Sequence, residues 1–286
     1  MKPIIKYVGG KTWLAPSLSS IIKKIDKFDS YGEAFFGGGG SFFGIVDELN
    51  CSTVHINDIS VPIISLYNDV INSPEELIVE YAILEEEFSK FCSDKFTTKD
   101  EMLGCNEFFN FIKKEFNKIK NVPSVSMSAK FMFLQQHSFN GLYRENRKGE
   151  YNTPFNWKAK PFNIDEMAKR IDDARAIFNR FDRVIISNND VFDLDTSKGL
   201  WYFDPPYLDD GSGMMTYNES GFNLNQHKRL AYKVLTCENF IYSNHPNTEI
   251  EEIFNGCSCE IVGRRNIMSS DPNARNQLRS EILIHR

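Results

Sequence analysis

The sequence predicts an α/β protein in which a doubly wound, Rossmann-like sheet is interrupted by a mainly helical insert. Two observations support this prediction. Short apolar stretches that end in glycine, acidic or other polar residues occupy 4–58 and return after about 164, as strands that alternate with helices do. Between them, 62–135 contains long stretches whose apolar residues recur at helical spacing. A chain of 286 residues can bury a core of this size.

The first part of the chain follows the plan of a nucleotide-binding βαβ unit. SYGEAFFGGGGSFF is a short strand that enters a glycine cluster, SFFGIVDEL can begin a helix, and STVHINDIS is a strand that ends in an acid. Glycines at such a turn permit positive φ and close approach of a ligand, although a plain flexible turn has the same composition. Asp58 stands where an acid can hold ribose hydroxyls; a turn or helix-capping aspartate is the alternative.

Residues 61–163 are predicted to form the insert. Its helices are SPEELIVEYAILEEEFSKF, NEFFNFIKKEFNKIK and SAKFMFLQQHSF, followed by an Asn-, Gly- and Arg-rich stretch that predicts a hairpin near 139–156. From 164 a helix precedes strands in RVIISNND, LWYFDPPY, NFIYSNH and LRSEILIHR. We therefore assign 1–60 and 164–286 to one domain and 61–163 to another.

Composition and charge restrict the class of protein. No apolar run reaches the ~18 residues that cross a bilayer, and the first residues lack a secretory apolar region, so we expect a soluble intracellular protein. The six cysteines show no paired spacing for zinc, so we expect reduced structural thiols and no metal. The net charge is −6, yet 113–160 holds ten Lys and Arg against three acids. This basic zone is either a footprint for phosphates or a solvated helix face with a loop.

The stretch LWYFDPPYLDD, residues 200–210, is the most informative motif. A strand that ends in Asp-Pro-Pro-Tyr places these residues where α/β sheets carry their active sites. Proline lacks a backbone donor and fixes φ, so Asp204 and the Pro205 carbonyl become rigid acceptors, and Tyr207 adds a flat face. Such a site suits a planar group with an NH2, because accepting both hydrogens withdraws the lone pair from conjugation. A Pro-Pro turn after a core strand is the alternative.

A second motif, IKYVGGKTWL at residues 5–14, combines lysines, an aromatic ring and Gly-Gly. It predicts a lid in which the ring lies beside a ligand and a cation lies near a carboxylate. A plain turn with solvated lysines has the same composition.

Together these stretches resemble one family, the Dam-type (D12 class, alpha group) DNA adenine N6-methyltransferases, over nearly the whole chain and in the family's order. KYVGGK resembles its N-terminal S-adenosylmethionine (SAM) motif, EAFFGGGGSFF its glycine motif, and NDISVPIISLYN its acidic ribose motif. FNGLYRENRKGEYNTPFN resembles its DNA-reading hairpin, and DPPY is its catalytic motif. Ala34 and Tyr7 stand where proline and tryptophan are usual, and Trp157 and Lys158 depart from the hairpin pattern.

The resemblance implies a SAM-dependent enzyme that methylates N6 of a flipped adenine in double-stranded DNA, at a site such as GATC. The doubly wound domain would then be a SAM-methyltransferase sheet, and the insert a DNA-recognition domain. The implied catalytic residues are Asp204, Pro205, Pro206 and Tyr207. The implied SAM-binding residues are Tyr7, Lys11, Glu33, Phe35, Gly37, Gly39, Asp58, Asp190 and Asp204. No metal is required, because the sulfonium methyl group is already electrophilic.

The resemblance also implies a set of DNA contacts: Lys6, Phe139, Asn140, Leu142, Arg144, Asn146, Arg147, Lys148 and Pro154. Phe139 and Asn140 would fill the gap left by the flipped base, and Arg144 would read a guanine edge. Lys148 and other basic residues of 113–160 would contact phosphates. We also expect DNA contacts from Arg264, Arg265 and Arg275.

Alternatives to this function stay open. The chain could methylate another planar amine or amide, in RNA or on a protein glutamine, although related enzymes of that kind carry Asn-Pro-Pro-Tyr. It could also be a non-catalytic DNA-binding relative, against which the intact Lys11, Asp58, Asp204 and Tyr207 argue. We expect a monomer in the cytoplasm of a bacterial cell or phage-infected host, with no membrane association.

Overall fold

The computed structural model describes residues 3–7, 10–93, 95–96, 98–207, 222–265 and 278–286. In this part of the chain seven strands form one sheet in the order β3-β2-β1-β4-β5-β7-β6. The parallel strands are β1 (Ser30–Glu33), β2 (Thr53–Asn57), β3 (Arg183–Ser187), β4 (Leu200–Phe203) and β5 (Asn239–Asn244). β7 (Leu278–His285) runs antiparallel between β5 and β6 (Ser258–Arg265). The predicted Rossmann-like sheet is confirmed, and β6 is a strand that the sequence pattern had not indicated.

The order of the strands creates a switch point between β1 and β4. From β1 the chain proceeds outward to β2 and β3, whereas β4 and β5 lie on the other side of β1. In such sheets, ligands bind in the crevice at the carboxyl ends of the strands that flank this point. Glu33 ends β1 and pairs with Tyr202 of β4, so Glu33 and Asp204 reach the crevice from adjacent strands.

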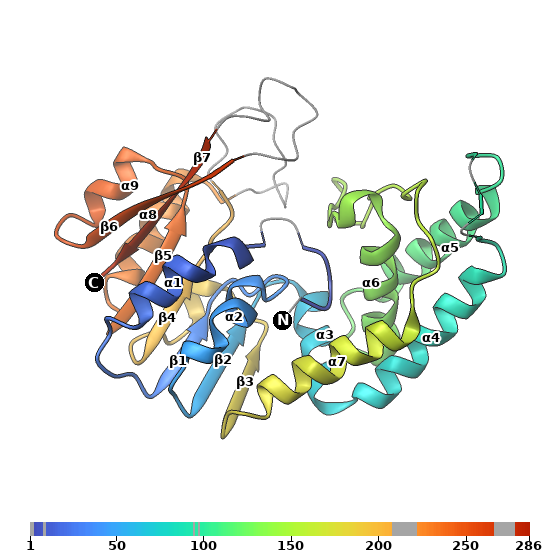
Figure 1. Cartoon of the computed structure of the whole chain (residues 1–286). Coiled ribbons are helices and arrows are strands. Elements are labelled where there is room, and N and C mark those ends of the chain that lie inside the picture. The colour runs from blue at the N-terminus through green and yellow to red at the C-terminus, as the bar shows by residue number, and fades with distance from the viewer. Residues whose placement is uncertain (1–2, 8–9, 94, 97, 208–221, 266–277) are drawn as a thin grey trace.

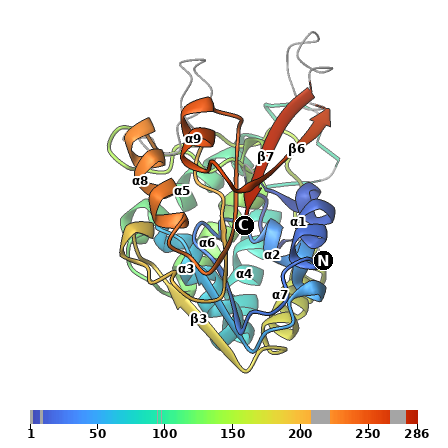
Figure 2. The same cartoon turned by 90° about the vertical axis from the view of Figure 1, so that its left-hand side faces the viewer.

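Alternate residues of the central strands face two hydrophobic cores. Leu200 and Tyr202 belong to the core that contains α1 (Ala15–Ile22) and α2 (Gly40–Ile45). Trp201 and Phe203 belong to the core that contains α8 (Leu224–Val234) and α9 (Thr248–Ile253). Figure 2 shows α1 and α8 on opposite sides of the strands. Because both faces are covered, β4 is apolar throughout and lacks an alternating pattern.

The remaining helices form a second body beside the sheet (Figure 1). They are α3 (Val61–Asn72), α4 (Pro74–Ser89), α5 (Leu103–Ile119), α6 (Val125–His137) and α7 (Ile164–Phe178). Ser124 and Asn163 cap the starts of α6 and α7 with their side-chain oxygens, which satisfies free backbone N–H groups there. Buried phenylalanines fill the space between α4, α5 and α6, among them Phe88, Phe109 and Phe133.

Helices α3 and α7 join this helical body to the sheet. Tyr67 of α3 packs edge-on against Phe36 at 4.7 Å between ring centroids. Phe178 of α7 stacks on Phe42 of α2 at 5.3 Å. In Figure 1, α7 runs from the helical body back to β3. The helical stretches predicted within 61–163 are present as α4, α5 and α6. Tyr67 of α3 joins this body to the glycine turn, and Phe178 of α7, which lies beyond 163, joins it to α2.

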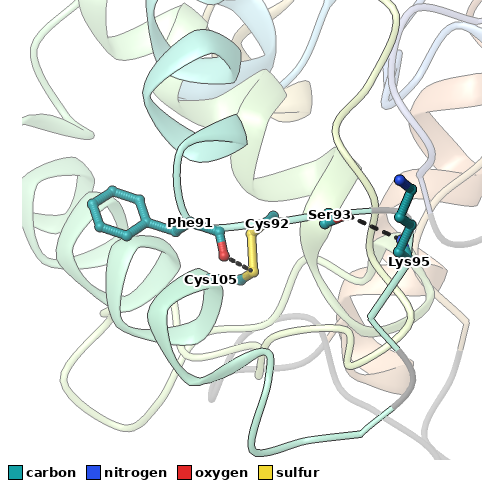
Figure 3. The surroundings of a disulfide bond; sticks show 5 residues. All are labelled: Phe91, Cys92, Ser93, Lys95 and Cys105. Atoms are coloured by element: carbon teal, nitrogen blue, oxygen red, sulfur yellow. Dashed lines mark hydrogen bonds between the residues drawn. A yellow bond between two sulfur atoms is a disulfide. The ribbon is translucent and has the colours of Figure 1, made fainter.

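One expectation about cysteine is wrong. Cys92, just after α4, and Cys105, in α5, form a disulfide with their Cα atoms 5.4 Å apart (Figure 3). The connection between α4 and α5 folds back and brings together two residues whose separation in the sequence matches no motif. Cys51, Cys237, Cys257 and Cys259 are free thiols.

No helix in the described ranges is long and apolar enough to span a membrane.

Candidate active site

The carboxylate of Asp204 lies at the centre of a buried polar cluster beyond the end of β4. Its Oδ1 accepts a hydrogen bond from Ser243 Oγ on β5 at 3.0 Å and lies 3.1 Å from Lys11 Nζ. Among the residues that the structure describes, no hydrogen bond reaches Oδ2, so this oxygen can accept from a ligand. Burial raises the pKa of Asp204 to about 6, with Lys11 opposing the rise and Glu281 adding to it.

Lys11 is the cation of this cluster. It precedes the short helix η1 (Thr12–Leu14), its side chain is only 4% exposed, and its Nζ contacts Asp204, Glu281 and the Tyr207 hydroxyl. Burial alone would lower the pKa of Lys11, but the carboxylates of Asp204 and Glu281 raise it well above its ordinary value. Lys11 therefore stays charged and partly neutralises two acids.

The side chain of Tyr207 is held by four contacts, one of which is the Lys11 ammonium 4.6 Å from the ring centroid. Its hydroxyl accepts from Lys11 Nζ at 2.7 Å and donates to Glu281 Oε2 at 3.0 Å. One face of the ring stacks on His245, with centroids 3.8 Å apart and planes inclined by 24°. Nearby, Asn244 Nδ2 donates to the Pro205 carbonyl at 3.4 Å, and Pro206 is half-buried. The Asp-Pro-Pro-Tyr segment is thus anchored to β5 and β7.

The glycine turn after β1 is ordered by two carboxylates. Gly37 and Gly39 have φ of 53° and 70°, a region that favours glycine. Asp58 accepts from Gly37 N at 2.8 Å and from Ser60 N at 2.9 Å, while burial raises its pKa. Glu33 accepts from Tyr31 at 2.7 Å and from Ser41 at 2.9 Å, and burial raises its pKa to about 8. The turn is therefore fixed from both ends before a ligand arrives.

Tyr7 lies over this turn. A Cβ atom at Gly38 would come within 2.7 Å of Tyr7 Cβ, and one at Gly37 within 3.1 Å of its ring, so side chains are excluded at both positions. Phe35 is half-buried and packs edge-on against Phe222 at 6.0 Å. Bare backbone, an acid and an aromatic ring are the groups that an adenosine moiety requires.

Asp190 follows β3, the strand next to β2 in the sheet. It is exposed, and its Oδ1 accepts from Phe192 N at 2.9 Å, which caps η4 (Val191–Asp193). Asn188 donates to the backbone carbonyl of Asp58 at 2.8 Å and so ties the end of β3 to the end of β2. Asp190 thus follows a strand end that is joined to Asp58, and it has no bond to the Lys11 cluster among the described residues.

The predicted hairpin follows α6 and begins with η3 (Phe139–Gly141). Antiparallel bridges join Ser138 to Phe155 and Glu145 to Tyr151. Phe139 is 50% exposed, and Asn140 has a φ of 57°. A Cβ atom at Gly141 would lie 2.6 Å from Lys6 Cβ, so glycine permits the N-terminal segment to lie against the hairpin. Figure 1 shows this region at the end of α6.

The other predicted DNA contacts differ in how free their side chains are. Arg144 is exposed, and its Nε donates to Asn152 at 2.9 Å. Asn146 closes the hairpin turn, because its Oδ1 accepts from the backbone N of Lys148 and of Glu150. The Leu142 carbonyl accepts a hydrogen bond from Thr153 Oγ1 at 2.9 Å, and the Pro154 carbonyl accepts one from the backbone N–H of Phe139 at 2.9 Å. Arg147 and Lys148 are exposed at the tip.

Part of the basic zone is already paired inside the protein. Lys120 contacts Glu145 in a mostly buried pair, Lys118 contacts Glu115 at 2.6 Å, and Lys130 donates to Ser126 at 2.6 Å. Lys158 and Lys160 are exposed. The side chains of Arg264 and Arg265 and all of Arg275 lie outside the described residues.

Sequence reasoning missed four residues of the cluster. Ser243 and Asn244 end β5 and His245 follows it, so polar residues at a strand's carboxyl end were the available signal. Glu281 lies inside the antiparallel strand β7 and is 2% exposed. Its only signal was an acid directly before the apolar run Ile282–Ile284.

Comparison with known proteins agrees with this geometry. Residues 7–269 match the family of D12 class N6 adenine-specific DNA methyltransferases. The type II methyltransferase M.MjaIII of Methanocaldococcus jannaschii is 31% identical over 81% of this chain and 78% of its own length. The DNA adenine methylase of Escherichia coli K12 is 24% identical over 97% of this chain and 92% of its own. A similar relative is the type II methyltransferase M1.LlaDCHI of Lactococcus lactis, 24% identical over 99% of this chain and 95% of its own.

The sheet order and the acid-lined switch point define the class of enzyme as a Rossmann-like methyltransferase. The chain belongs to the D12 class N6 adenine-specific DNA methyltransferase family. It is therefore an adenine-specific DNA methyltransferase, and the alternatives of a protein or RNA substrate and of a non-catalytic protein are set aside.

Proposed function

We propose that the crevice at the ends of β1, β2 and β4 binds SAM and presents its methyl group to an adenine held by Asp204, Pro205 and Tyr207. The fixed glycine turn supports this proposal, because it brings Gly37, the ring of Tyr7 and the Asp58 carboxylate together, and an acid at this position can hold ribose hydroxyls. SAM supplies an electrophilic sulfonium methyl group when it is bound. Lys11, Glu33, Phe35, Gly39 and Asp190 complete the proposed pocket.

The single observation that carries the proposal is Asp204 Oδ2, which accepts no hydrogen bond from the described residues, beside an anchored tyrosine ring. Asp204 Oδ2 and the Pro205 carbonyl accept the two amine hydrogens, while the ring of Tyr207 stacks on the base. Accepting both amine hydrogens keeps the lone pair on N6 and out of conjugation with the adenine ring. Lys11 keeps Asp204 ionised at neutral pH, where a buried acid with a pKa of about 6 is mostly deprotonated.

The helical body and the hairpin form the proposed DNA-recognition part. The target adenine is inaccessible in a duplex, so it must be flipped out, which costs a few kcal/mol. Phe139 and Asn140 are exposed where the hairpin meets Lys6, and we assign them to the gap in the stack. We assign Arg144 to a base edge, and Arg147 and Lys148 to phosphates. The remaining predicted contacts shape or line the same surface: Lys6, Leu142, Asn146 and Pro154.

The proposed function is tested by mapping modified bases in DNA from cells that express the protein. We expect N6-methyladenine in one short recurring sequence, such as a tetranucleotide. DNA without N6-methyladenine, in cells where the protein is folded and abundant, would overturn the proposal. The same experiment identifies the target sequence.

Substitutions at Tyr207 separate the roles of its ring and its hydroxyl. Tyr207→Ala should reduce kcat/KM more than Tyr207→Phe or Tyr207→Trp, because base–aromatic stacking contributes about 1–3 kcal/mol. The phenylalanine variant should still lose some activity, since Lys11 and Glu281 lose their shared hydroxyl partner. The measurement is methyl transfer to a cognate duplex. Equal losses for Phe and Ala would show that the hydroxyl does the work.

Substitutions in the hairpin separate phosphate contacts from base reading. Lys148→Ala should weaken binding to every DNA sequence alike. The slope of log binding constant against log salt concentration should become shallower by about one unit. Arg144→Ala should weaken binding to the cognate duplex far more than binding to the scrambled duplex. The ratio of the two affinities should therefore fall by roughly ten- to a hundredfold. Fluorescence anisotropy with cognate and scrambled duplexes at several salt concentrations measures both effects. Lys169→Ala, on the surface of α7, serves as the control.

An Arg144→Ala variant that loses affinity for both duplexes equally would assign Arg144 to a phosphate. Base reading would then move to Lys6, Lys158 or Asn146. Lys6 is the strongest of these candidates, because it lies against Gly141 of the hairpin.

A further inference from the structure

A buried carboxylate from β7 joins the catalytic cluster without contacting any group that we assign to a substrate. Glu281 is 2% exposed, and both of its oxygens are engaged. Its Oε1 contacts Lys11 Nζ, and its Oε2 accepts from the Tyr207 hydroxyl at 3.0 Å. Burying a carboxylate is unfavourable unless it is paired and hydrogen-bonded, so the fold retains Glu281 in contact with these two residues.

We propose that Glu281 is a positioning residue for methyl transfer, which holds the Lys11 ammonium and the Tyr207 ring so that Asp204 keeps one oxygen free for the amine. The proposal rests on the proposed function in its assignment of that oxygen. Lys11 Nζ reaches Asp204 Oδ1 at 3.1 Å and contacts Glu281 Oε1 at the same time, so the two carboxylates share one ammonium. Without Glu281, the ammonium is free to move across the Asp204 carboxylate and the Tyr207 ring loses its hydroxyl acceptor.

The charge of Glu281 also acts on Asp204. Six titratable groups interact with Asp204, four from strands and two from connecting segments: Glu33 of β1, Tyr202 of β4, Tyr242 of β5, Glu281 of β7, Lys11 before η1 and Tyr207 after β4. In this set Glu281 raises the pKa of Asp204 and Lys11 lowers it. Removing the charge of Glu281 therefore lowers the pKa of Asp204.

Two substitutions at this position divide charge from hydrogen bonding. Glu281→Gln keeps the size and an acceptor for Lys11, whereas Glu281→Ala removes both contacts. We expect the acidic limb of the kcat profile to move to lower pH in both variants, by roughly one pH unit. We expect kcat to fall at least about tenfold in the alanine variant and less in the glutamine variant, with the SAM dissociation constant changing less than kcat.

The matched control is Glu260→Gln on the neighbouring strand β6. Glu260 is half-buried, pairs with Lys24 at 3.3 Å and lies 3.7 Å from His285, and neither partner belongs to the Lys11 cluster. This control carries the same change in charge, so it should keep the wild-type pH profile and kcat. An unchanged acidic limb in Glu281→Gln, or an equal shift in Glu260→Gln, would overturn the proposal.

A second readout requires no methylation. The folded pKa of Asp204, about 6, lies above its ordinary value of 3.8, so this group binds more protons in the folded state, and its contribution to stability falls as pH rises through this interval. Urea unfolding across this range should show a smaller fall in Glu281→Gln than in wild type or Glu260→Gln. This result would support the role of Glu281 even if no adenine were methylated, and identical curves would contradict it.

Discussion

Replacement of Asp204 by alanine is expected to abolish methyl transfer while the protein remains folded. The amine of adenine is a weak nucleophile, and the carboxylate stabilises the charge that develops on it only as the methyl group is transferred. Loss of one preorganised polar group of this kind typically costs a factor of about 10²–10³ in kcat. We therefore expect at least about a hundredfold loss.

The fold should survive this change because Lys11 keeps a second carboxylate, that of Glu281. The control is Asp182→Ala, an exposed aspartate before β3 at the opposite end of the sheet. Methyl transfer, thermal unfolding and SAM binding are measured for both variants. Activity of Asp204→Ala within tenfold of wild type would remove Asp204 from the catalytic role, and some loss of SAM affinity is expected since the carboxylate borders both ligands.

The parts of this site that could be predicted from the sequence are those encoded by local motifs. Asp204, Pro205 and Tyr207 follow a strand directly, and the rule that α/β sheets carry ligands at the carboxyl ends of strands is sufficient to find them. Gly37, Gly39 and Asp58 were found by the same rule. The alternation of helical and strand stretches was also sufficient to predict the Rossmann-like sheet, which the strand order confirms.

The parts that escaped prediction depend on tertiary contacts between distant segments. Glu281 lies 270 residues from Lys11 in the chain and contacts it only because β7 inserts between β5 and β6. The disulfide between Cys92 and Cys105 arises because the connection from α4 returns onto α5. Asn146 was expected to contact DNA, but its amide also closes the hairpin turn, a local competition that composition does not reveal.

Replacement of Lys11 by methionine should reduce both stability and activity. Methionine fills much of the same volume but leaves the buried carboxylates of Asp204 and Glu281 facing each other without a cation. Removing one partner of a buried ion pair typically destabilises a protein by about 3–5 kcal/mol. Because Lys11 lowers the pKa of Asp204, this variant should raise it above about 6.

Lys11→Met and Glu281→Gln should shift the pKa of Asp204, and with it the pH dependence of kcat, in opposite directions. In Lys11→Met the acidic limb of kcat should move to higher pH, and the stability deficit should shrink as pH falls, because the carboxylates then take up protons in the folded state. Urea unfolding and methyl transfer at several pH values measure both effects, with Lys24→Met, an exposed lysine paired with Glu260, as the control. If Lys11→Met and Glu281→Gln moved the acidic limb in the same direction, the opposing action of these two charges on Asp204 would be refuted. Opposite shifts would establish that the cluster sets the ionisation of the carboxylate that receives the adenine amine.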